Sequence, residues 1–161
     1  MHSSSYNLVK ELVTQYYCGG SVADIGSAIV ENQDMSYRDF FKKEDYVGVD
    51  ISHGNNVDII CNLEKNSLDN KVSFIVCGQV LEHVRKPWVF FENIEKSLIK
   101  HGTAIIVAPS AGQYHAYPYD CYRFFSDGLI ALAEHAGLRI IVSGQLHTPP
   151  WCDSFIVVQK C

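Results

Sequence analysis

The chain has 161 residues, 47% of them hydrophobic and 19% charged, and a formal net charge of −5. That composition fits one globular domain and excludes a disordered chain. The acidic balance argues against nucleic acid as a partner, because binding a phosphate backbone needs clustered Lys and Arg. We therefore expect a single domain over residues 1–161.

Neither a membrane segment nor a metal motif is expected. The N-terminus has no apolar signal-peptide core, and the apolar runs are far shorter than the roughly 18 residues of a membrane-spanning helix. The cysteines form no C-x-x-C pair, and no two of the seven histidines have convincing metal-ligand spacing. Cys61 and Cys77 lie in or beside apolar runs, where a free cysteine acts as a small buried hydrophobe. The sequence thus predicts a soluble, cytoplasmic protein with reduced thiols, and it identifies no metal ligand, which leaves metal dependence open.

Hydrophobic spacing predicts the following elements in chain order. The first half holds a helix at 4–17, a strand at 21–25, a weak helix near 34–43, and strands at 46–51 and 57–61. The second half holds a strand at 72–77, a helix at 87–99 closed by residues 100–102, a strand at 103–108, a helix capped by Ser126 through His135, and strands at 138–142 and 155–158. Alternating strands and helices predict an α/β domain with a mainly parallel, seven-stranded sheet and helices on both faces.

Two short segments indicate a ligand site at the ends of the first two strands. In such sheets ligands bind beyond the carboxyl ends of the strands. Asp24 ends the first strand, and Gly26 then lets the backbone turn and lets a ligand approach closely. Asp50 ends the second strand, where an acid can accept hydrogen bonds from both ribose hydroxyls. Together these segments predict a nucleoside-binding pair.

The longest signal runs from Val72 to Pro109. It comprises a buried strand, the segment 80–84 (Val-Leu-Glu-His-Val), a helix, a glycine turn and a strand that ends in Ala-Pro. With the segments 24–27 (Asp-Ile-Gly-Ser) and 48–51 (Gly-Val-Asp-Ile), it resembles the class I S-adenosylmethionine-dependent methyltransferases, specifically the methyltransferase type 11 group. The resemblance covers roughly residues 20–145. It implies a Rossmann-like domain of reduced size, S-adenosylmethionine as cofactor and methyltransferase activity.

The resemblance also implies which residues bind the cofactor. The first glycine turn would cradle the methionine part, and the acid of the second strand would hold the ribose. Residues after the third strand would flank the adenine, and the end of the fourth strand would line the floor near the methyl group. In this sequence these residues are Asp24, Gly26 and Ser27; Asp50 and Ile51; Cys61, Asn62 and Leu63; and Cys77, Gly78 and Gln79.

The chain departs from the family pattern at several places. Ala28 stands where another glycine is usual, Asn62 where an acid is common, and Ser73 where an Asp often opens the strand. The usual Pro-Gly-Gly turn is replaced at residues 100–102 by Lys-His-Gly. These departures leave a non-catalytic, methyltransferase-like binding module as the alternative. A nicotinamide-dependent oxidoreductase is disfavoured, because its G-x-G-x-x-G fingerprint is missing.

A polar and aromatic segment at 114–125 is the candidate acceptor site. It resembles the His-x-Tyr-Pro-x-Asp-x-x-Arg-Phe segment of type 11 relatives that are associated with sugar modification. Aromatic faces suit the C–H surface of a sugar, and polar tips can fix its hydroxyls. The resemblance thus implies a small-molecule or glycan acceptor, although a purely structural loop remains the alternative. The candidate substrate-binding residues are Tyr114, Tyr117, Tyr119 and Arg123.

Methylation of a hydroxyl needs a group that takes its proton. His115 is the first candidate, because an imidazole titrates near neutral pH. Asp120 would either orient His115 or act as the base itself. His83 is the third candidate, and its alternative is a structural histidine that fixes the loop after the fourth strand.

Overall fold

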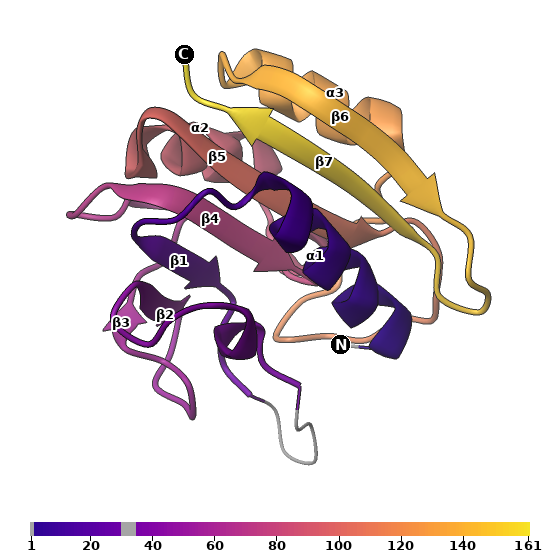
Figure 1. The fold of residues 1–161 in the computed structure, drawn as a ribbon. Helices are drawn as coiled ribbons and strands as arrows, with labels where there is room; N and C mark the ends of the chain where they lie inside the picture. Colours follow the sequence, from indigo (N-terminus) through magenta and orange to yellow (C-terminus); the bar gives the residue numbers. More distant parts are fainter. Residues whose placement is uncertain (1, 30–34) are drawn as a thin grey trace.

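The computed structural model describes residues 2–29 and 35–161. Its centre is a seven-stranded sheet in the order β3-β2-β1-β4-β5-β7-β6 (Figure 1). The strands are β1 (Val22–Ile25), β2 (Tyr46–Asp50), β3 (Ile59–Ile60), β4 (Val72–Gly78), β5 (Leu98–Pro109), β6 (Arg139–Leu146) and β7 (Asp153–Gln159). Neighbours from β3 to β5 pair in parallel, whereas β7 is antiparallel to both β5 and β6. This confirms the predicted α/β domain with a mainly parallel sheet.

Helices cover both faces of the sheet. They are α1 (Ser3–Tyr16), α2 (Pro87–Ser97) and α3 (Ser126–His135), with short 3-10 helices η1 (Tyr37–Phe40) and η2 (Leu81–His83). In Figure 1, α1 crosses one face while α2 and α3 lie behind the other. Side chains alternate across β4, so that Phe74 packs on the α1 side and Ile75 on the α2 and α3 side. A strand buried on both faces reads as a continuous apolar run, which is why β4 could be predicted from the sequence.

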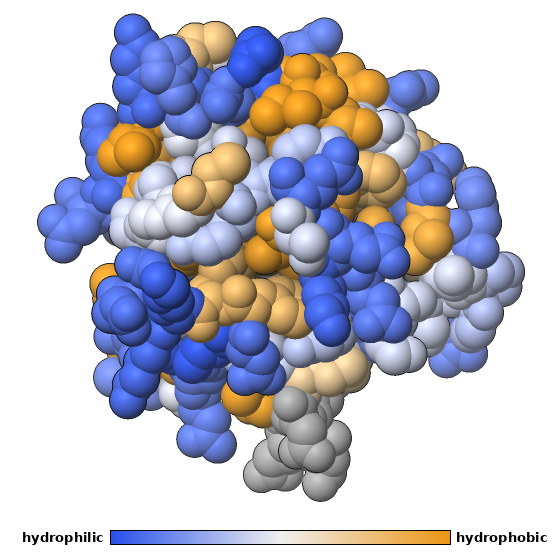
Figure 2. Space-filling view, viewed as in Figure 1, coloured by the Kyte–Doolittle hydropathy of each residue, from blue (hydrophilic) through white to orange (hydrophobic). Residues whose placement is uncertain are grey.

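The surface on the α1 side is unevenly covered. Figure 2 shows hydrophilic residues around the edge of this face and over α1, and hydrophobic residues over β6 and β7. Ile141 of β6 is 39% exposed. In the part of the chain that the structure describes, no helix is both long and apolar enough to cross a bilayer.

The helix predicted at 87–99 is two residues too long. It ends at Ser97, and β5 begins at Leu98, because Leu98 is fully buried and pairs with Val72 of β4. Residues 100–102, expected to close the helix, therefore belong to β5, where the pairing register shifts. Burial of one leucine in the sheet outweighs the continuing helical spacing.

Other boundaries also differ from the prediction. Of the weak helix near 34–43, the structure has only the four-residue η1, and residue 34 lies outside the described residues. Ser126 is the first residue of α3 rather than its cap, because Phe125 takes the cap position without a side-chain hydrogen bond. Strand β6 continues to Leu146, beyond the predicted end at residue 142.

The topology brings several loops to one edge of the sheet. Strands β1, β2, β4 and β5 are parallel, so their carboxyl ends and the loops that follow them meet there. Strand β7 runs the other way, and its first residue, Asp153, pairs with the last residue of β5, Pro109. The turn before β7 therefore reaches the same edge as the loops where a ligand is expected.

Candidate functional site

A cavity of about 880 Å³ lies at this edge of the sheet. All of the predicted cofactor-binding residues line it except Cys77. The thiol of Cys77 is fully buried in the core on the α2 side, and burial raises its pKa well above the usual value. Cys77 therefore lies beneath the cavity, whereas its neighbours Gly78 and Gln79 form the wall.

The turn after β1 is built around Gly26. Its φ is +83°, in the left-handed region that favours glycine, and a Cβ there would lie 2.1 Å from Cγ2 of Val80. The backbone N–H groups of Gly26 and Ser27 both donate to the carbonyl of Val49, at 2.8 and 3.1 Å. The turn is thus fixed against β2 and allows a ligand to approach the main chain.

Asp24 lies at the base of this turn. Its side chain is buried and accepts a hydrogen bond from the hydroxyl of Tyr46. Burial raises the pKa of Asp24 from 3.8 to about 7. A carboxyl group with a raised pKa at a cavity wall gains from a cationic partner, such as the ammonium group of the methionine part of a cofactor.

Asp50 and Ile51 form the next part of the wall. The carboxylate of Asp50 accepts from the backbone N–H of Ala28 at 3.2 Å and from that of Ile51 at 2.7 Å. Each carboxylate oxygen retains a further lone pair, so both can still accept ribose hydroxyls. The side chain of Ile51 is 55% exposed beside it. Ala28 therefore does not break the contact between the two motifs.

Residues 61–63 follow β3 on the same wall. The side-chain oxygen of Asn62 accepts from the backbone N–H of Glu64 at 2.8 Å, which fixes a turn. Leu63 is almost fully buried, and its carbonyl accepts from Asn93 of α2 at 2.8 Å. Cys61, Asn62 and Leu63 thus contribute both apolar and polar groups to the cavity wall.

Several cavity residues lie outside the motifs and were missed by sequence analysis. Among them are the aromatic or titratable residues His2, Tyr37 and Trp151. The hydroxyl of Tyr37 is buried without a hydrogen-bond partner among the described residues. It packs so closely on Gly78 that a Cβ at this position would lie only 2.1 Å from the hydroxyl oxygen. Trp151 stacks with His2 at 5.8 Å between ring centroids. Only the antiparallel course of β7 places Trp151 here, so no local pattern could have indicated it.

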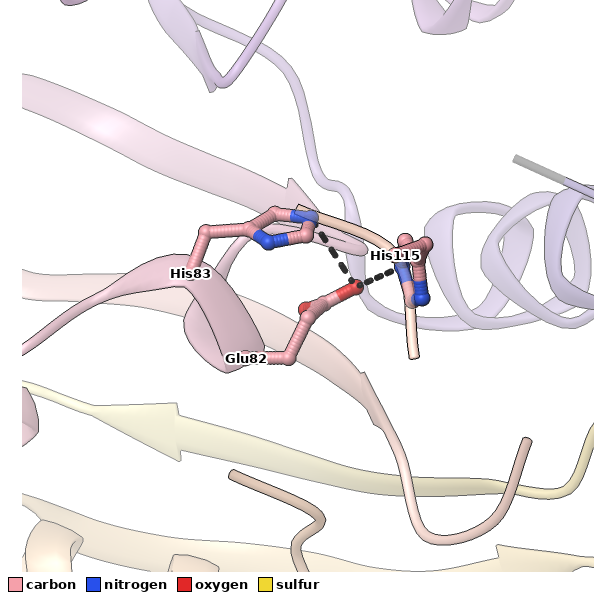
Figure 3. A group of neighbouring side chains, drawn as sticks. All are labelled: Glu82, His83 and His115. Carbon is pink, nitrogen blue, oxygen red and sulfur yellow. Dashed lines mark ion pairs between the residues drawn. The ribbon is translucent and has the colours of Figure 1, made fainter. Parts of the chain in front are cut away.

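The catalytic candidates His83 and His115 meet at a third residue, Glu82 (Figure 3). Glu82 and His83 belong to η2, and His115 comes from the segment after β5. Nε2 of each histidine lies 3.6 Å from the same carboxylate oxygen, Oε1 of Glu82. All three side chains line the cavity. We call them the Glu82–His83–His115 cluster.

Glu82 is unusual within this cluster. It is fully buried, and neither of its carboxylate oxygens has a hydrogen-bond partner in residues 2–29 and 35–161. Burial raises the pKa of Glu82 from 4.5 to about 7. An unpaired buried carboxylate is costly, so a site that keeps one has a ligand to hold or a proton to handle. Sequence analysis passed over Glu82, although it lies in the segment that carries the resemblance.

The two imidazoles are oriented by main-chain carbonyls. Nδ1 of His83 lies 2.6 Å from the carbonyl of Tyr119, and Nδ1 of His115 lies 3.0 Å from that of Gln113. A carbonyl can only accept, so each Nδ1 carries a proton and each neutral ring presents a free lone pair on Nε2. Burial lowers the pKa of His83. Both rings therefore aim a basic nitrogen toward Glu82 and the cavity.

Asp120 and Arg123 hold the segment at 114–125 in place. The side chain of Asp120 is only 2% exposed and does not line the cavity. It pairs with the guanidinium of Arg123 at 2.5 Å and accepts from the backbone N–H of His115 at 2.7 Å. This pairing lowers the pKa of Asp120 to about 2. Of the two roles considered for Asp120, the geometry favours positioning of His115.

The predicted substrate-binding tyrosines divide into two groups. Tyr117 and Tyr119 line the cavity, and Tyr119 also packs under the guanidinium of Arg85 at 5.0 Å. Tyr114 is 78% exposed and, like Arg123, does not line the cavity. The structure thus brings two of the four predicted substrate-binding side chains to the site.

Substitution of Glu82 by glutamine should show the cost of burying this carboxyl group. Between pH 4.5 and about 7, the carboxyl group of Glu82 is ionised in the unfolded chain but protonated in the folded chain, because folding raises its pKa. The free energy of unfolding therefore falls as the pH rises through this window. We expect Glu82→Gln to be about 1–3 kcal/mol more stable than the wild type above pH 7, and the difference to vanish below pH 4.5. Urea unfolding with EDTA present measures it. Glu92→Gln, on exposed α2 surface, is the control, and a pH-independent difference for Glu82→Gln would contradict the expectation.

Comparison with known proteins places this architecture. No family model and no curated protein matches the sequence. The solved structure of 1,6-didemethyltoxoflavin-N1-methyltransferase from Burkholderia thailandensis, with S-adenosylhomocysteine bound, matches 98% of this chain and 78% of that one, with a TM-score of 0.75 and 12% identity. Magnesium protoporphyrin IX methyltransferase from Synechocystis PCC 6803, with S-adenosylmethionine bound, matches over 98% of this chain and 79% of its own, with a TM-score of 0.66 and 13% identity. The cyclase SpnF matches over 96% of this chain and 81% of its own, with a TM-score of 0.68 and 10% identity.

The chain therefore has the fold of the class I S-adenosylmethionine-dependent methyltransferases. Its strand order, with a final antiparallel β7 inserted beside β5, is the order of that fold. At these identities the likeness concerns the fold, and what each relative binds or converts belongs to that relative. Function has to be argued from the cavity of this chain.

Proposed function

We propose that this protein is an S-adenosylmethionine-dependent methyltransferase that methylates a hydroxyl group of a small acceptor, with a sugar as the acceptor class. The observation that carries the proposal is the continuity of the cavity. One space of about 880 Å³ joins the Gly26 turn and Asp50 to the Glu82–His83–His115 cluster. A nucleoside cofactor and a proton-accepting cluster can therefore share it.

The residues of the first two strand ends fit the cofactor. The Gly26 turn would hold the methionine part, beside the carboxyl group of Asp24. Asp50 would hold the ribose with its remaining lone pairs, and residues 61–63 would face the adenine. The cofactor supplies an electrophilic methyl group on a positively charged sulfur.

The cluster would activate and orient the acceptor. The hydroxyl oxygen attacks the methyl carbon as the carbon–sulfur bond breaks, and the sulfur keeps that electron pair. The hydroxyl proton passes to Nε2 of His115, whose lone pair is free because its Nδ1–H is held by the carbonyl of Gln113. Glu82, 3.6 Å away, would stabilise the imidazolium that forms. Asp120 positions His115 by accepting a hydrogen bond from the backbone N–H of His115.

The choice of a sugar rests on the rings at the cavity wall. Tyr117 and Tyr119 are both partly exposed there, and Trp151 packs edge-on against His115 of the same loop, at 5.5 Å between ring centroids. Exposed aromatic faces beside polar groups suit a ligand with C–H surfaces and hydroxyls. A flat aromatic acceptor would use the same rings, so the acceptor class has to be tested directly.

Calorimetry with S-adenosylhomocysteine is the first test. We expect one equivalent to bind, with a dissociation constant in the range usual for enzyme ligands, about 1 μM to 1 mM. Screening of hydroxyl acceptors, with formation of S-adenosylhomocysteine as the readout, is the second test. Absence of binding to folded protein would overturn the proposal. Binding without turnover on any acceptor would favour the non-catalytic module, or another reaction on the same fold, such as the cyclase SpnF illustrates.

A further inference from the structure

The Glu82–His83–His115 cluster contains the ligand set of a metal site. Two imidazole nitrogens and one carboxylate oxygen lie within 4.8 Å of one another. Two histidines with one glutamate, leaving a further position open, form a recurrent catalytic set for zinc and related divalent metals. Sequence analysis found no such set because the spacing of histidines along the chain does not bring His83 and His115 together. The fold does (Figure 3).

The distances within the cluster suit a shared ion better than direct contacts. Oε1 of Glu82 lies 3.6 Å from Nε2 of His83 and 3.6 Å from Nε2 of His115. A hydrogen bond between nitrogen and oxygen is about 2.7–3.2 Å long, so neither distance is one. Ligands about 2.1 Å from a metal at tetrahedral angles are about 3.4 Å apart. The two distances to Glu82 are thus close to this value, and the ligand atoms of the two histidines, which lie within 4.8 Å of each other, would close to about 3.4 Å around an ion.

A second observation points to a cation. The carboxylate of Glu82 is fully buried, aims at the cavity and has no hydrogen-bond partner in the described part of the chain. The guanidinium of Arg123 donates two hydrogen bonds to Asp120. Arg123 therefore forms its ion pair with Asp120 and donates no hydrogen bond to Glu82. A metal ion would compensate the charge of a buried carboxylate that accepts no hydrogen bond from the described residues.

The surroundings of the two histidines complete the pattern. Metal-binding histidines almost always donate their other ring N–H to a carbonyl or carboxylate, which fixes the tautomer and the ring orientation. Here Nδ1 of His83 donates to the carbonyl of Tyr119, and Nδ1 of His115 to that of Gln113. Both rings are therefore held with Nε2 toward Glu82.

We propose that Glu82, His83 and His115 bind one divalent transition-metal ion, whose open position faces the cavity and takes the hydroxyl oxygen of the acceptor. The mixed nitrogen and oxygen set favours Zn²⁺, Co²⁺ and their neighbours over Mg²⁺ and Ca²⁺, which prefer oxygen alone. The second half of the proposal rests on the proposed methyl transfer. It changes the role of His115 from base to ligand.

In this arrangement the metal would lower the pKa of the bound hydroxyl, as it does that of bound water. The hydroxyl proton leaves to solvent, and the oxygen then attacks the methyl carbon as the carbon–sulfur bond breaks. The proton therefore needs no imidazole, and the hydroxyl is fixed at one point of the cavity.

Titration of the full chain, freed of metal by EDTA and then of EDTA by dialysis, tests the site. Co²⁺ is the probe, because nitrogen-ligated tetrahedral Co²⁺ absorbs visible light strongly. We expect one equivalent to produce this absorption and Zn²⁺ to displace it, whereas Mg²⁺ should not. No Co²⁺ absorption in the wild type would overturn the proposal, and displacement by Mg²⁺ at equal concentration would overturn the preference for a transition metal.

Variants locate the site. Glu82→Gln and His115→Gln should each weaken Co²⁺ binding by more than the about 10- to 100-fold that loss of an outer partner of a ligand costs. His135→Gln is the matched control, because His135 also faces a glutamate, Glu92 at 2.9 Å, on exposed helix surface. Unchanged Co²⁺ binding in both cluster variants, or loss in the control alone, would overturn the assignment. Glu82→Gln removes an unpaired buried charge, so it should fold.

The readouts separate this proposal from the proposed function. Binding of S-adenosylhomocysteine is measured in the presence of EDTA, and binding of Co²⁺ is measured in the absence of the cofactor. Cofactor binding can therefore fail while metal binding succeeds, and the reverse. An acceptor found by the screen should shift the Co²⁺ absorption of the wild type. An acceptor that is methylated at an undiminished rate in EDTA would overturn the role of the metal in holding the hydroxyl.

Discussion

Replacement of Asp50 by alanine should weaken binding of S-adenosylhomocysteine by about 1.5–3 kcal/mol, or roughly 10- to 150-fold. The carboxylate stands at the end of β2 on the cavity wall, held by the backbone N–H groups of Ala28 and Ile51. A charged acceptor already fixed in place loses little freedom when it binds two ribose hydroxyls. Calorimetry measures the change, with urea unfolding to show that the variant is folded.

A control separates ribose binding from loss of negative charge. Asp127→Ala removes an exposed acid in the first turn of α3, which contributes nothing to the cavity lining. It should bind S-adenosylhomocysteine as the wild type does. Asp50→Asn keeps an acceptor oxygen and should fall between the wild type and Asp50→Ala. Wild-type affinity in both Asp50 variants would show that the ribose is held elsewhere.

The cavity wall formed by the loops after β1 and β2 could be predicted because its signals are local. A buried strand that ends in an acid and turns through glycine places Asp24 and Gly26 whatever the rest of the chain does. The position of Asp50 beside this turn could also be predicted, because parallel strands bring their carboxyl ends to one edge of the sheet. Cys77 shows the limit of this reasoning, since alternation along β4 turns its side chain into the core on the α2 side.

The cavity wall around Glu82 and the loop at 114–125 could be predicted only in part, because it depends on distant contacts. The loop at 114–125 was indicated by its composition, but the pairing of Asp120 with Arg123 and with the backbone of His115 was not. That pairing draws Asp120 away from the cavity. The meeting of Glu82 with His115 needs the parallel pairing of β4 with β5, and Trp151 needs the antiparallel β7. Periodicity in the sequence carries neither piece of information.

Replacement of His115 by alanine should lower turnover by about 10²- to 10⁴-fold, while the affinity for S-adenosylhomocysteine stays nearly unchanged. Nε2 of His115 faces the cavity beside Glu82, whereas the expected contacts of the cofactor lie on the loops after β1, β2 and β3 and at the end of β4. Both possible roles of the imidazole, as base or as metal ligand, act on the acceptor. Rates of S-adenosylhomocysteine formation with an acceptor from the screen measure the loss.

Asp120 provides the comparison that makes the His115 result specific. As a positioning residue it reaches the acceptor only through His115 and Arg123, so Asp120→Ala should lower turnover less than His115→Ala. Asp120→Asn, which keeps an oxygen for the backbone N–H of His115, should recover part of the rate. Neither should change binding of S-adenosylhomocysteine. If His115→Ala and Asp120→Ala both work at the wild-type rate, the loop is structural and His83, the other imidazole at Glu82, becomes the candidate base. If both lose S-adenosylhomocysteine binding instead, the loop closes over the cofactor, and the division of the cavity into a cofactor side and an acceptor side is wrong.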